Sequence, residues 1–225
     1  MKLIKQVTTC SDHVCDGESR PPNVPHRLIS VINFNQAAEN NKKPILAELK
    51  RILVEPGALL EIGSGSGQHV LYMAELLQDV IWQPTEMAVN LSALAHNLTS
   101  SRIHNILQPL ELEVGKDWAN GEYRYAYAAN VLHIMSEKLL PSIFKELKEV
   151  VQAGGIAVFY GPFKYNGYFT TDSNKRFDEW LRKKYSEAGI RDIEMVLAEA
   201  HNSGFTFIED IAMPANNQLL VFSRQ

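Results

Sequence analysis

Apolar residues along the chain alternate between short continuous runs and helical spacings. The continuous runs predict strands at residues 58–62, 80–83, 110–114, 125–132 and 156–160. Between them, apolar residues recur every three or four positions, which is the spacing of a helix with one buried face. The run 125–132 is almost wholly apolar or aromatic, as in a strand buried on both faces of a parallel sheet. The alternation therefore predicts an α/β fold with a Rossmann-like, doubly wound sheet.

The last third of the chain departs from this alternation. Two helical patterns follow one another around residues 177–185 and 193–200, and two apolar runs, 205–211 and 219–222, come last. The connection between these runs, residues 213–217, is short and rich in turn-forming residues, which predicts an antiparallel hairpin. Added to the sheet, the hairpin gives seven strands, mostly parallel with one antiparallel strand near the C-terminus.

Local signals set the expected boundaries of the domain and its elements. Residues 1–26 contain several prolines and no sustained periodicity, so we expect an irregular N-terminal arm followed by a single domain over residues 27–225. A helix ending at Pro56-Gly57 precedes the first strand. Ser136 is the expected N-cap of the helix around residues 140–151, and Gly154-Gly155 its expected end.

Composition and charge remove several classes of function. The 225 residues are 45% hydrophobic and 21% charged, as in ordinary globular domains, and the net charge of −4 gives no electrostatic support for a nucleic-acid partner. No apolar run approaches the roughly 20 residues of a membrane span, and the N-terminus turns polar before a signal-peptide core forms. We therefore expect a cytoplasmic protein in which Cys10 and Cys15 are free thiols. His13 lies between them without a second ligand pair, so no metal site is expected.

The most informative segment joins the first predicted strand to the next helix, and it reads Glu61-Ile62-Gly63-Ser64-Gly65-Ser66-Gly67-Gln68. Glycines here let the backbone turn tightly and approach a ligand closely, while the helix N-terminus presents unpaired N–H groups. Glu86 follows nineteen residues after Gly67, at the end of the second strand. A carboxylate at that place can accept hydrogen bonds from both hydroxyls of a ribose. The two features predict a site for a nucleoside-containing cofactor.

The spacing of the glycines separates the possible cofactors. A dinucleotide fingerprint that starts at Gly63 requires glycine at position 68, where this chain has glutamine. The Gly-Lys-Ser/Thr ending of a phosphate-binding loop is also missing. Glu61, two residues before the first glycine, is unfavourable beside a pyrophosphate and suits a ligand with a positively charged amino group.

The pattern Glu61-x-Gly63-x-Gly65-x-Gly67 resembles motif I of the class I S-adenosylmethionine-dependent methyltransferases. The resemblance implies that Glu61 places the methionine ammonium, that the loop with Ser64 follows the methionine part of S-adenosylmethionine, and that Glu86 binds the ribose. Glu113-Val114 resembles the pair that meets the adenine edge, although Glu111 offers a second register. Asn130-Val131-Leu132-His133 corresponds to motif IV, which adds Asn130 to the cofactor-binding residues.

Further segments narrow the resemblance. They are residues 37–45 (AAENNKKPI), 65–69 (GSGQH), 82–84 (WQP), 160–163 (YGPF) and 213–217 (MPANN). Together they resemble one uncharacterised family of small methyltransferase-like proteins over roughly residues 27–225. This resemblance adds Asn41 to the cofactor-binding residues, whereas Asn40 departs from the arginine that is more usual in relatives. It implies no proven reaction.

Methyl transfer requires that the acceptor be aligned with the methyl group and, for some acceptors, that a proton be removed. His133, just past the fourth strand, is the candidate base, and Tyr160, at the end of the fifth, is the candidate for contacting the substrate. Each has a structural alternative: a histidine bonded to backbone at a strand end, and a core tyrosine with a satisfied hydroxyl. Asn216 and Asn217 fit either a substrate contact or a hairpin turn.

Features that the sequence lacks narrow the acceptor. Asn130 is followed by Val-Leu-His rather than by the Pro-Pro-Tyr of amino-methylating nucleic-acid enzymes. The densest basic run, Arg182-Lys183-Lys184, is expected to be a solvated helix face. A small-molecule acceptor is therefore favoured over nucleic acid or membrane, with residues 1–40 and 163–189 covering part of its pocket, and the oligomeric state stays open. The alternatives are an NAD-dependent oxidoreductase and a non-catalytic binding protein that keeps the nucleoside pocket.

Overall fold

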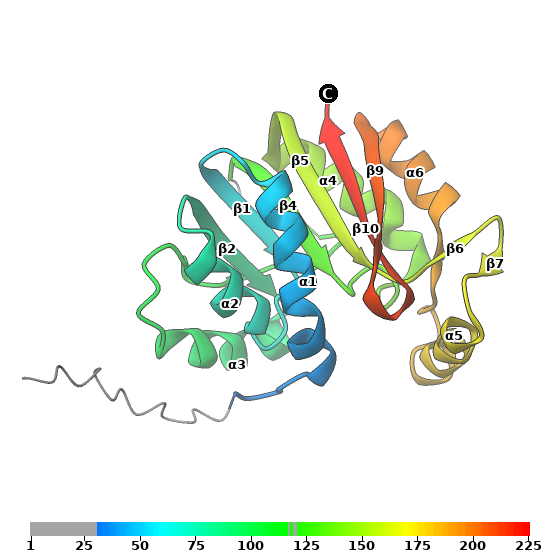
Figure 1. Cartoon of the computed structure of the whole chain (residues 1–225), viewed down its shortest axis with the longest axis horizontal. Coiled ribbons are helices and arrows are strands. Elements are labelled where there is room, and N and C mark those ends of the chain that lie inside the picture. Colours follow the sequence, from blue (N-terminus) through cyan, green and yellow to red (C-terminus); the bar gives the residue numbers. More distant parts are fainter. Residues whose placement is uncertain (1–30, 117, 119–120) are drawn as a thin grey trace, which may run out of the picture. The chain divides into compact units, whose positions relative to one another are not determined.

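The structure is a computed structural model that describes residues 31–116, 118 and 121–225 (Figure 1). Residues Val31–Gln225 form one compact unit. The expected arm over residues 1–26 lies outside the described residues.

The helices and strands follow the predicted alternation. The helices are α1 (Gln36–Ile52), α2 (Gln68–Leu76), α3 (Ala88–Thr99), α4 (Leu140–Val150), α5 (Asp172–Lys184) and α6 (Ile193–Asn202), with 3₁₀ turns at Glu137–Leu139 and Pro214–Asn216. The strands of the main sheet are β1 (Gly57–Ile62), β2 (Val80–Glu86), β3 (Leu110–Glu111), β4 (Tyr123–Ala129), β5 (Val151–Gly161), β9 (Phe205–Met213) and β10 (Asn217–Arg224).

The main sheet has seven strands in the order β3-β2-β1-β4-β5-β10-β9. Strands β3, β2, β1, β4 and β5 are parallel to their neighbours, while β10 is antiparallel to both β5 and β9. This confirms the predicted Rossmann-like sheet and its one antiparallel strand. From β1 the chain moves outward to β2 and β3, and from β4 it moves the other way to β5. The carboxyl ends of β1 and β4 therefore flank the switch point, where parallel α/β sheets form ligand-binding crevices.

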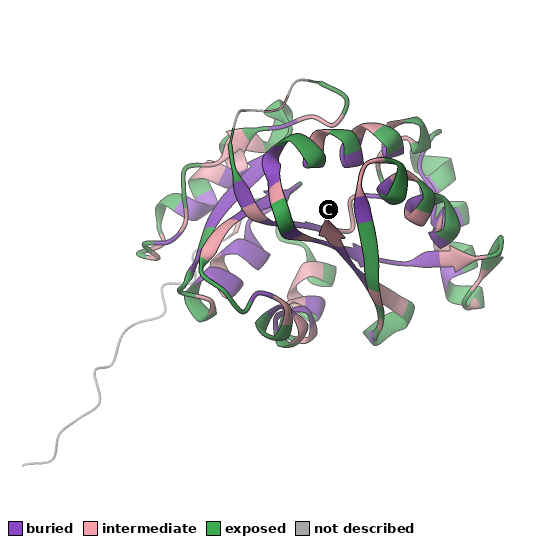
Figure 2. Cartoon of the chain, turned by 90° about the horizontal axis from the view of Figure 1, so that it is seen from above, coloured by how far each residue is buried: buried purple, intermediate pink, exposed green. Residues whose placement is uncertain are grey.

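Helices cover both faces of the sheet. Helices α1, α2 and α3 pack on one face through residues such as Ile45, Met73 and Leu94, which are all fully buried. Helices α4 and α6 pack on the other face through Phe144 and Val196. Viewed from above, the buried strands lie between helices whose outer faces are exposed (Figure 2). The apolar periodicity of each helix thus marks the side that it buries against the sheet.

Three predicted boundaries were wrong. Helix α4 ends at Val150, and Gly154 and Gly155 lie inside β5 rather than closing the helix. The β4–β5 register shifts there, and a Cβ on Gly155 would come within 2.6 Å of the carbonyl oxygen of Arg124, so glycine permits a close backbone approach inside the strand.

The other two errors concern the segment after β4. The strand ends at Ala129 rather than near residue 132, because Asn130 adopts a positive φ of 60° that no strand can continue. Ser136 precedes the 3₁₀ turn Glu137–Leu139 instead of capping α4, and its side chain makes no capping hydrogen bond.

A second, three-stranded sheet was not predicted. Its strands β6 (Phe163–Tyr165), β7 (Tyr168–Phe169) and β8 (Arg191–Asp192) lie in the order β7-β6-β8. Each is too short to show a hydrophobic period. In Figure 1 this sheet and α5 lie at one side of the main sheet. Within the part of the chain that the structure describes, no helix has the length and apolar character needed to cross a membrane.

Candidate active site

The glycine-rich loop between β1 and α2 depends on glycine at three positions. Gly63, Gly65 and Gly67 have φ values of 69°, 57° and 78°, in the left-handed region that other residues enter only at a cost. A Cβ on Gly63 would lie 2.9 Å from a methyl of Val131. At Gly65 a Cβ would meet nothing within 4 Å, so this backbone borders open space.

That open space belongs to a cavity of about 540 Å³ at the carboxyl ends of β1, β2 and β4. Eight of the ten predicted cofactor-binding residues line it: Glu61, Gly63, Ser64, Gly65, Glu86, Glu113, Val114 and Asn130. Of the other two, Gly67 is the N-cap of α2 beside Leu94 and Leu98, and Asn41 lines a second cavity. The second register is not used, since Glu111 is exposed and lies outside the lining.

Glu61 and Glu86 are the buried carboxyl groups of this first cavity. Glu61 accepts a hydrogen bond from the Ser64 hydroxyl at 2.9 Å. Glu86 accepts from the backbone N–H of Gly65 at 2.7 Å and of Met87 at 2.9 Å, which ties the loop to the end of β2. Burial raises the pKa of Glu61 to about 8, and the negative charge of Glu86 adds to this rise. The hydrogen bond from Ser64 lowers the pKa and offsets only part of it. Glu61 is therefore protonated at neutral pH and gains most from a cationic ligand group.

A second cavity of about 820 Å³ lies next to the first. Asn35, Asn130 and Ile134 line both, so the two spaces share a border. The candidate catalytic residues His133 and Tyr160 both line the second cavity. The two cavities therefore meet at the end of β4.

A chain of hydrogen bonds leads from the buried side of α2 to Tyr160. His69 Nδ1 lies 3.0 Å from the hydroxyl of Tyr127, and its Nε2 lies 2.7 Å from Oδ1 of Asn41. An amide oxygen can only accept, so His69 Nε2 is the donor to Asn41 and Nδ1 accepts from the hydroxyl of Tyr127.

Asn41 also interacts with Tyr160, since its side chain counters part of the rise that burial causes in the pKa of the Tyr160 hydroxyl. Because Oδ1 of Asn41 accepts from His69, its amide nitrogen is the group that can donate to Tyr160. Tyr160 lines the second cavity, where its own hydroxyl can donate to a ligand.

His133 is buried, but its ring is not held by a structural hydrogen bond. Its backbone carbonyl accepts from the N–H of Gly189 at 2.9 Å, and its ring packs edge-on against Phe177. Neither ring nitrogen has a hydrogen-bond partner among residues 31–116, 118 and 121–225. Burial, assisted by the positive charge of Arg191, lowers the pKa of His133 to about 4. The imidazole is thus neutral at physiological pH with a free lone pair, and the same burial makes it a weaker base than an exposed histidine.

Asn216 and Asn217 combine the two roles considered for them. Asn216 has a positive φ of 57°, and its carbonyl accepts from the side chain of Asn174 at 3.0 Å. The amide of Asn217 donates to the carbonyls of Pro214 and Ala215. Both asparagines build the hairpin turn, and both line the second cavity.

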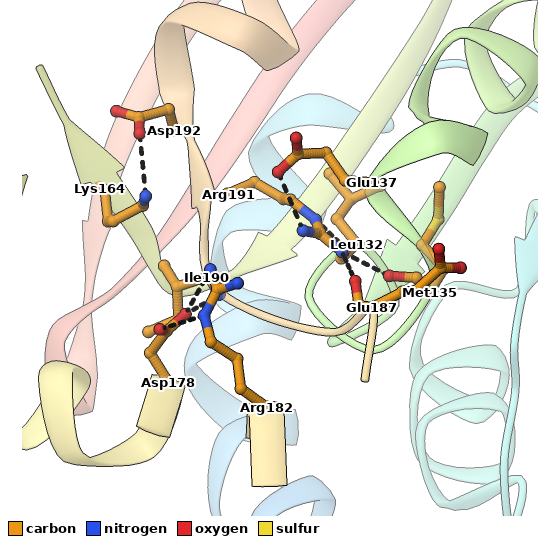
Figure 3. Close-up of polar contacts among 10 residues, drawn as sticks. All are labelled: Leu132, Met135, Glu137, Lys164, Asp178, Arg182, Glu187, Ile190, Arg191 and Asp192. Atoms are coloured by element: carbon orange, nitrogen blue, oxygen red, sulfur yellow. Dashed lines mark hydrogen bonds and ion pairs between the residues drawn. The ribbon is translucent and has the colours of Figure 1, made fainter. Parts of the chain in front are cut away.

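The buried Arg191 fixes the loop that carries His133 (Figure 3). Its guanidinium donates to the carbonyls of Leu132, Met135 and Glu187 and pairs with Glu137 at 3.3 Å.

Nearby, the carboxylate of Asp178 on α5 accepts from the N–H of Ile190 at 2.6 Å and from Arg182 at 2.7 Å (Figure 3). These bonds hold α5 and residues 185–191 against the end of β4. They explain why two segments far apart in the sequence form one wall.

Several residues of the second cavity were missed. Lys184 is exposed, as expected for a solvated face, but the sequence did not indicate that it also lines this cavity with Phe177, Trp180 and Asn174. Their spacing of three and four residues is a helical signal, but nothing in the sequence says what that face meets. The described part of the chain contains no group of three or more His, Cys, Asp or Glu side chains arranged to hold a metal ion.

Three buried titratable groups predict a stability maximum near pH 6.5. Between about pH 4.5 and 6.5, unfolding adds protons to His69 and His133 and removes one from Glu61. The net uptake of one proton makes stability rise by about 1.4 kcal/mol per pH unit. Above pH 6.5, Glu61 is the one of these three groups whose protonation differs between the folded and unfolded states, since it keeps its proton up to about pH 8 in the fold. Unfolding then releases a proton, so stability falls as the pH rises. Urea unfolding at pH 5, 6.5 and 8 measures this.

The control for this pH dependence is Glu61→Gln. It keeps the shape of the side chain without the ionisation, so the fall between pH 6.5 and 8 should disappear. A wild-type protein whose stability stays constant over that interval would show that Glu61 is ionised in the fold.

Three solved methyltransferase structures superpose on this chain. SibL, described as S-adenosylmethionine-dependent, superposes with a TM-score of 0.71 at 13% identity over 84% of this chain and 55% of that one. An O-methyltransferase family protein from Burkholderia thailandensis superposes with a TM-score of 0.72 and 10% sequence identity, over 82% of this chain and 56% of that one. Human N-acetylserotonin methyltransferase in complex with SAM superposes with a TM-score of 0.68 and 14% sequence identity, over 81% of this chain and 51% of that one. This chain spans about half the length of these proteins, and at such identities the likeness concerns the fold.

The sequence itself matches one family model over residues 32–224, almost the whole of the compact unit Val31–Gln225. The chain therefore belongs to the family described as "Protein of unknown function (DUF938)".

Proposed function

We propose that this protein is an S-adenosylmethionine-dependent methyltransferase that acts on a small-molecule acceptor. The observation that carries the proposal is the buried Glu61 at the start of the glycine loop, which lines the first cavity together with Glu86 on the next strand and has no basic partner among the residues that the structure describes. A buried carboxyl group without a charge partner is costly to ionise, and a ligand ammonium removes that cost. The methyltransferase fold supports the same cofactor.

The first cavity fits this cofactor. Glu61 would hold the methionine ammonium, and the backbone from Gly63 to Gly65 would follow the methionine chain. Oε2 of Glu86 has a second lone pair beyond its bond to Gly65, and Oε1 accepts from Met87 and, at 3.5 Å, from the side chain of Asn90, a long contact that a ribose hydroxyl could replace. Leu112 and Val114 form an apolar wall suited to adenine, with the carboxylate of Glu113 at its edge. Asn41 is reassigned from the cofactor to the acceptor side, where it can donate to Tyr160.

When bound, S-adenosylmethionine supplies a methyl group whose bond to sulfur breaks as the acceptor's lone pair bonds the carbon, leaving a neutral thioether. Asn35, Asn130 and Ile134 would set the path between the two cavities. His133 would take the proton that a hydroxyl acceptor releases, at whichever ring nitrogen faces it. Tyr160 would donate to the acceptor and fix its orientation. Packing of α5 and the β9–β10 turn would limit water around this step.

Calorimetric titration tests the cofactor. We expect saturable binding of S-adenosylmethionine and S-adenosylhomocysteine and none of NAD, the ligand of the alternative oxidoreductase. Glu86→Ala should weaken binding by about tenfold or more, since it removes the predicted ribose contacts and the anchor of Gly65. The matched control is Glu111→Ala, because Glu111 faces Glu86 across β2 and β3 but lies outside the cavity. Binding of NAD alone would contradict the proposal.

The same titration reports the ionisation of Glu61. At pH 7 the group is protonated, and pairing with an ammonium requires it to lose that proton. Repeating the experiment in buffers of different ionisation enthalpy should show about one proton released for each cofactor bound. Glu61→Gln should abolish this release. Tight cofactor binding without methyl transfer to any tested acceptor would instead favour the non-catalytic alternative.

A further inference from the structure

One wall of the second cavity is aromatic and unusually exposed. Phe177 and Trp180 on α5 stack with ring planes 14° apart and centroids separated by 5.9 Å. Trp180 is 50% exposed, and Tyr185, just past the end of the helix, is 43% exposed. Large aromatic side chains that stay exposed beside a cavity mark a binding surface more often than a packing defect. The edge contact of Phe177 with His133 connects this wall to the candidate base.

The described side chains that line the second cavity include a positive charge and no negative charge. Its lining contains no aspartate or glutamate, and most of its polar side chains are the neutral amides of asparagines. The one ammonium or guanidinium group in the lining is that of Lys184. Its Nζ lies 5.0 Å from the ring centroid of Trp180 and 5.1 Å from that of Tyr185. Over the described stretches of chain, Lys184 has no carboxylate partner, and the adjacent Lys183 adds to the positive potential, whereas Arg182 is neutralised by its ion pair with Asp178.

The neighbouring elements do not compensate this charge inside the cavity. The polar residues that line the cavity from α1, the ends of β4 and β5 and the β9–β10 turn are asparagines, Tyr160 and the neutral His133. The hydroxyl of Tyr160 and the amides of the asparagines can donate hydrogen bonds to lone pairs on a ligand. The cavity thus offers a planar surface, hydrogen-bond donors and one cation, an environment that disfavours a positively charged ligand.

We propose that the acceptor is a planar aromatic molecule that carries a carboxylate. Its ring lies along Phe177 and Trp180, its carboxylate pairs with Lys184, and its methyl-accepting hydroxyl faces His133 and Tyr160. This inference rests on the proposed function, and it goes beyond it in naming the class of acceptor. A carboxylate at the Lys184 end places the opposite end of the ring toward the border with the cofactor cavity.

The test compares three ligands of one shape on the protein saturated with S-adenosylhomocysteine: para-hydroxybenzoate, para-hydroxybenzamide and para-hydroxybenzylamine. Binding is followed by calorimetry and by tryptophan fluorescence, since Trp180 lies at the site. We expect the carboxylate to bind about tenfold more tightly than the neutral amide, and the cationic amine to bind most weakly.

Two matched variants locate the effect. Lys184→Met keeps an apolar stem against Trp180 and removes the charge, so the tenfold preference for the carboxylate should vanish. Lys183→Met removes the adjacent charge, which does not line the cavity, and should preserve the preference. Trp180→Leu should lower the affinities for para-hydroxybenzoate and para-hydroxybenzamide by a similar factor, because it removes the stacking surface and leaves the charge of Lys184.

The outcomes separate this inference from the proposed function. Three results would overturn the proposed class of acceptor. They are equal affinities for para-hydroxybenzoate and para-hydroxybenzamide, a preference for the carboxylate that survives in Lys184→Met, and no binding of para-hydroxybenzoate at all. In each of those cases, intact binding of S-adenosylhomocysteine leaves the proposed function standing. Failure of S-adenosylhomocysteine itself to bind would overturn both.

Discussion

Replacing Gly65 by arginine is expected to abolish cofactor binding while leaving a folded protein. The Cβ of this residue would project into open space at the first cavity, so the fold can accommodate the side chain, which then occupies the cofactor's place. We expect affinity for S-adenosylhomocysteine to fall by about a hundredfold or more, which corresponds to a loss of at least ~2.7 kcal/mol of binding free energy. Calorimetric titration measures it.

A control must separate this block from backbone strain. Gly167 in the β6–β7 turn has a φ of 79° and, like Gly65, no atom within 4 Å of its Cβ position. Both arginine variants therefore carry a left-handed penalty of about 1–2 kcal/mol in unfolding free energy. Only Gly65→Arg should lose the cofactor. If Gly65→Arg bound the cofactor as wild type does, the glycine loop would not be the binding site.

Replacing Arg191 by methionine is expected to cause the largest loss of stability. Arg191 is 2% exposed, and its guanidinium satisfies three backbone carbonyls besides pairing with Glu137. Methionine has a similar length but no donors, so the carbonyls are left buried without partners. Breaking a buried charged cluster in this way costs about 3–5 kcal/mol of unfolding free energy, which urea denaturation measures.

Two further variants keep this prediction testable. Arg51→Met removes an exposed arginine that pairs with Glu48 and Glu209, and its unfolding midpoint should stay near that of wild type. Arg191→Lys keeps the charge and loses the branched donor geometry, so its loss of unfolding free energy should lie between those of Arg51→Met and Arg191→Met. A loss below about 1 kcal/mol for Arg191→Met would show that the cluster does not hold the segment after β4.

The cofactor side of the molecule could be predicted because its signals are local. Strands β1 and β2 appear as apolar runs, the glycine spacing marks the turn between β1 and α2, and Glu86 is found by its distance along the chain. Parallel strands place all these features at one edge of the sheet, so eight of the ten predicted residues line one cavity. Asn41 was the less local prediction, and its hydrogen bond to His69 places it on the other cavity.

The acceptor side could not be predicted to the same extent, since its wall comes from separate parts of the chain. Residues of α1, the segment after β4, α5 and the β9–β10 turn meet there, and no sequence period reports such a meeting. Lys184 illustrates the limit: it is exposed, as its charge suggested, but only the packing of α5 sets this exposed side chain beside the cavity. Arg191 lies in a two-residue strand, and its role depends on carbonyls more than fifty residues earlier in the chain.

By itself, the sequence determined the class of fold, the order of its main elements and the position of the glycine loop at the end of β1. These depend on periodicity and on backbone conformations that specific residues impose. The tertiary structure alone decided that Glu113 rather than Glu111 lines the first cavity, that Asn41 bonds His69, and which side chains line the second cavity. These depend on side-chain contacts across the fold, whose energies arise only when distant segments pack and exclude water.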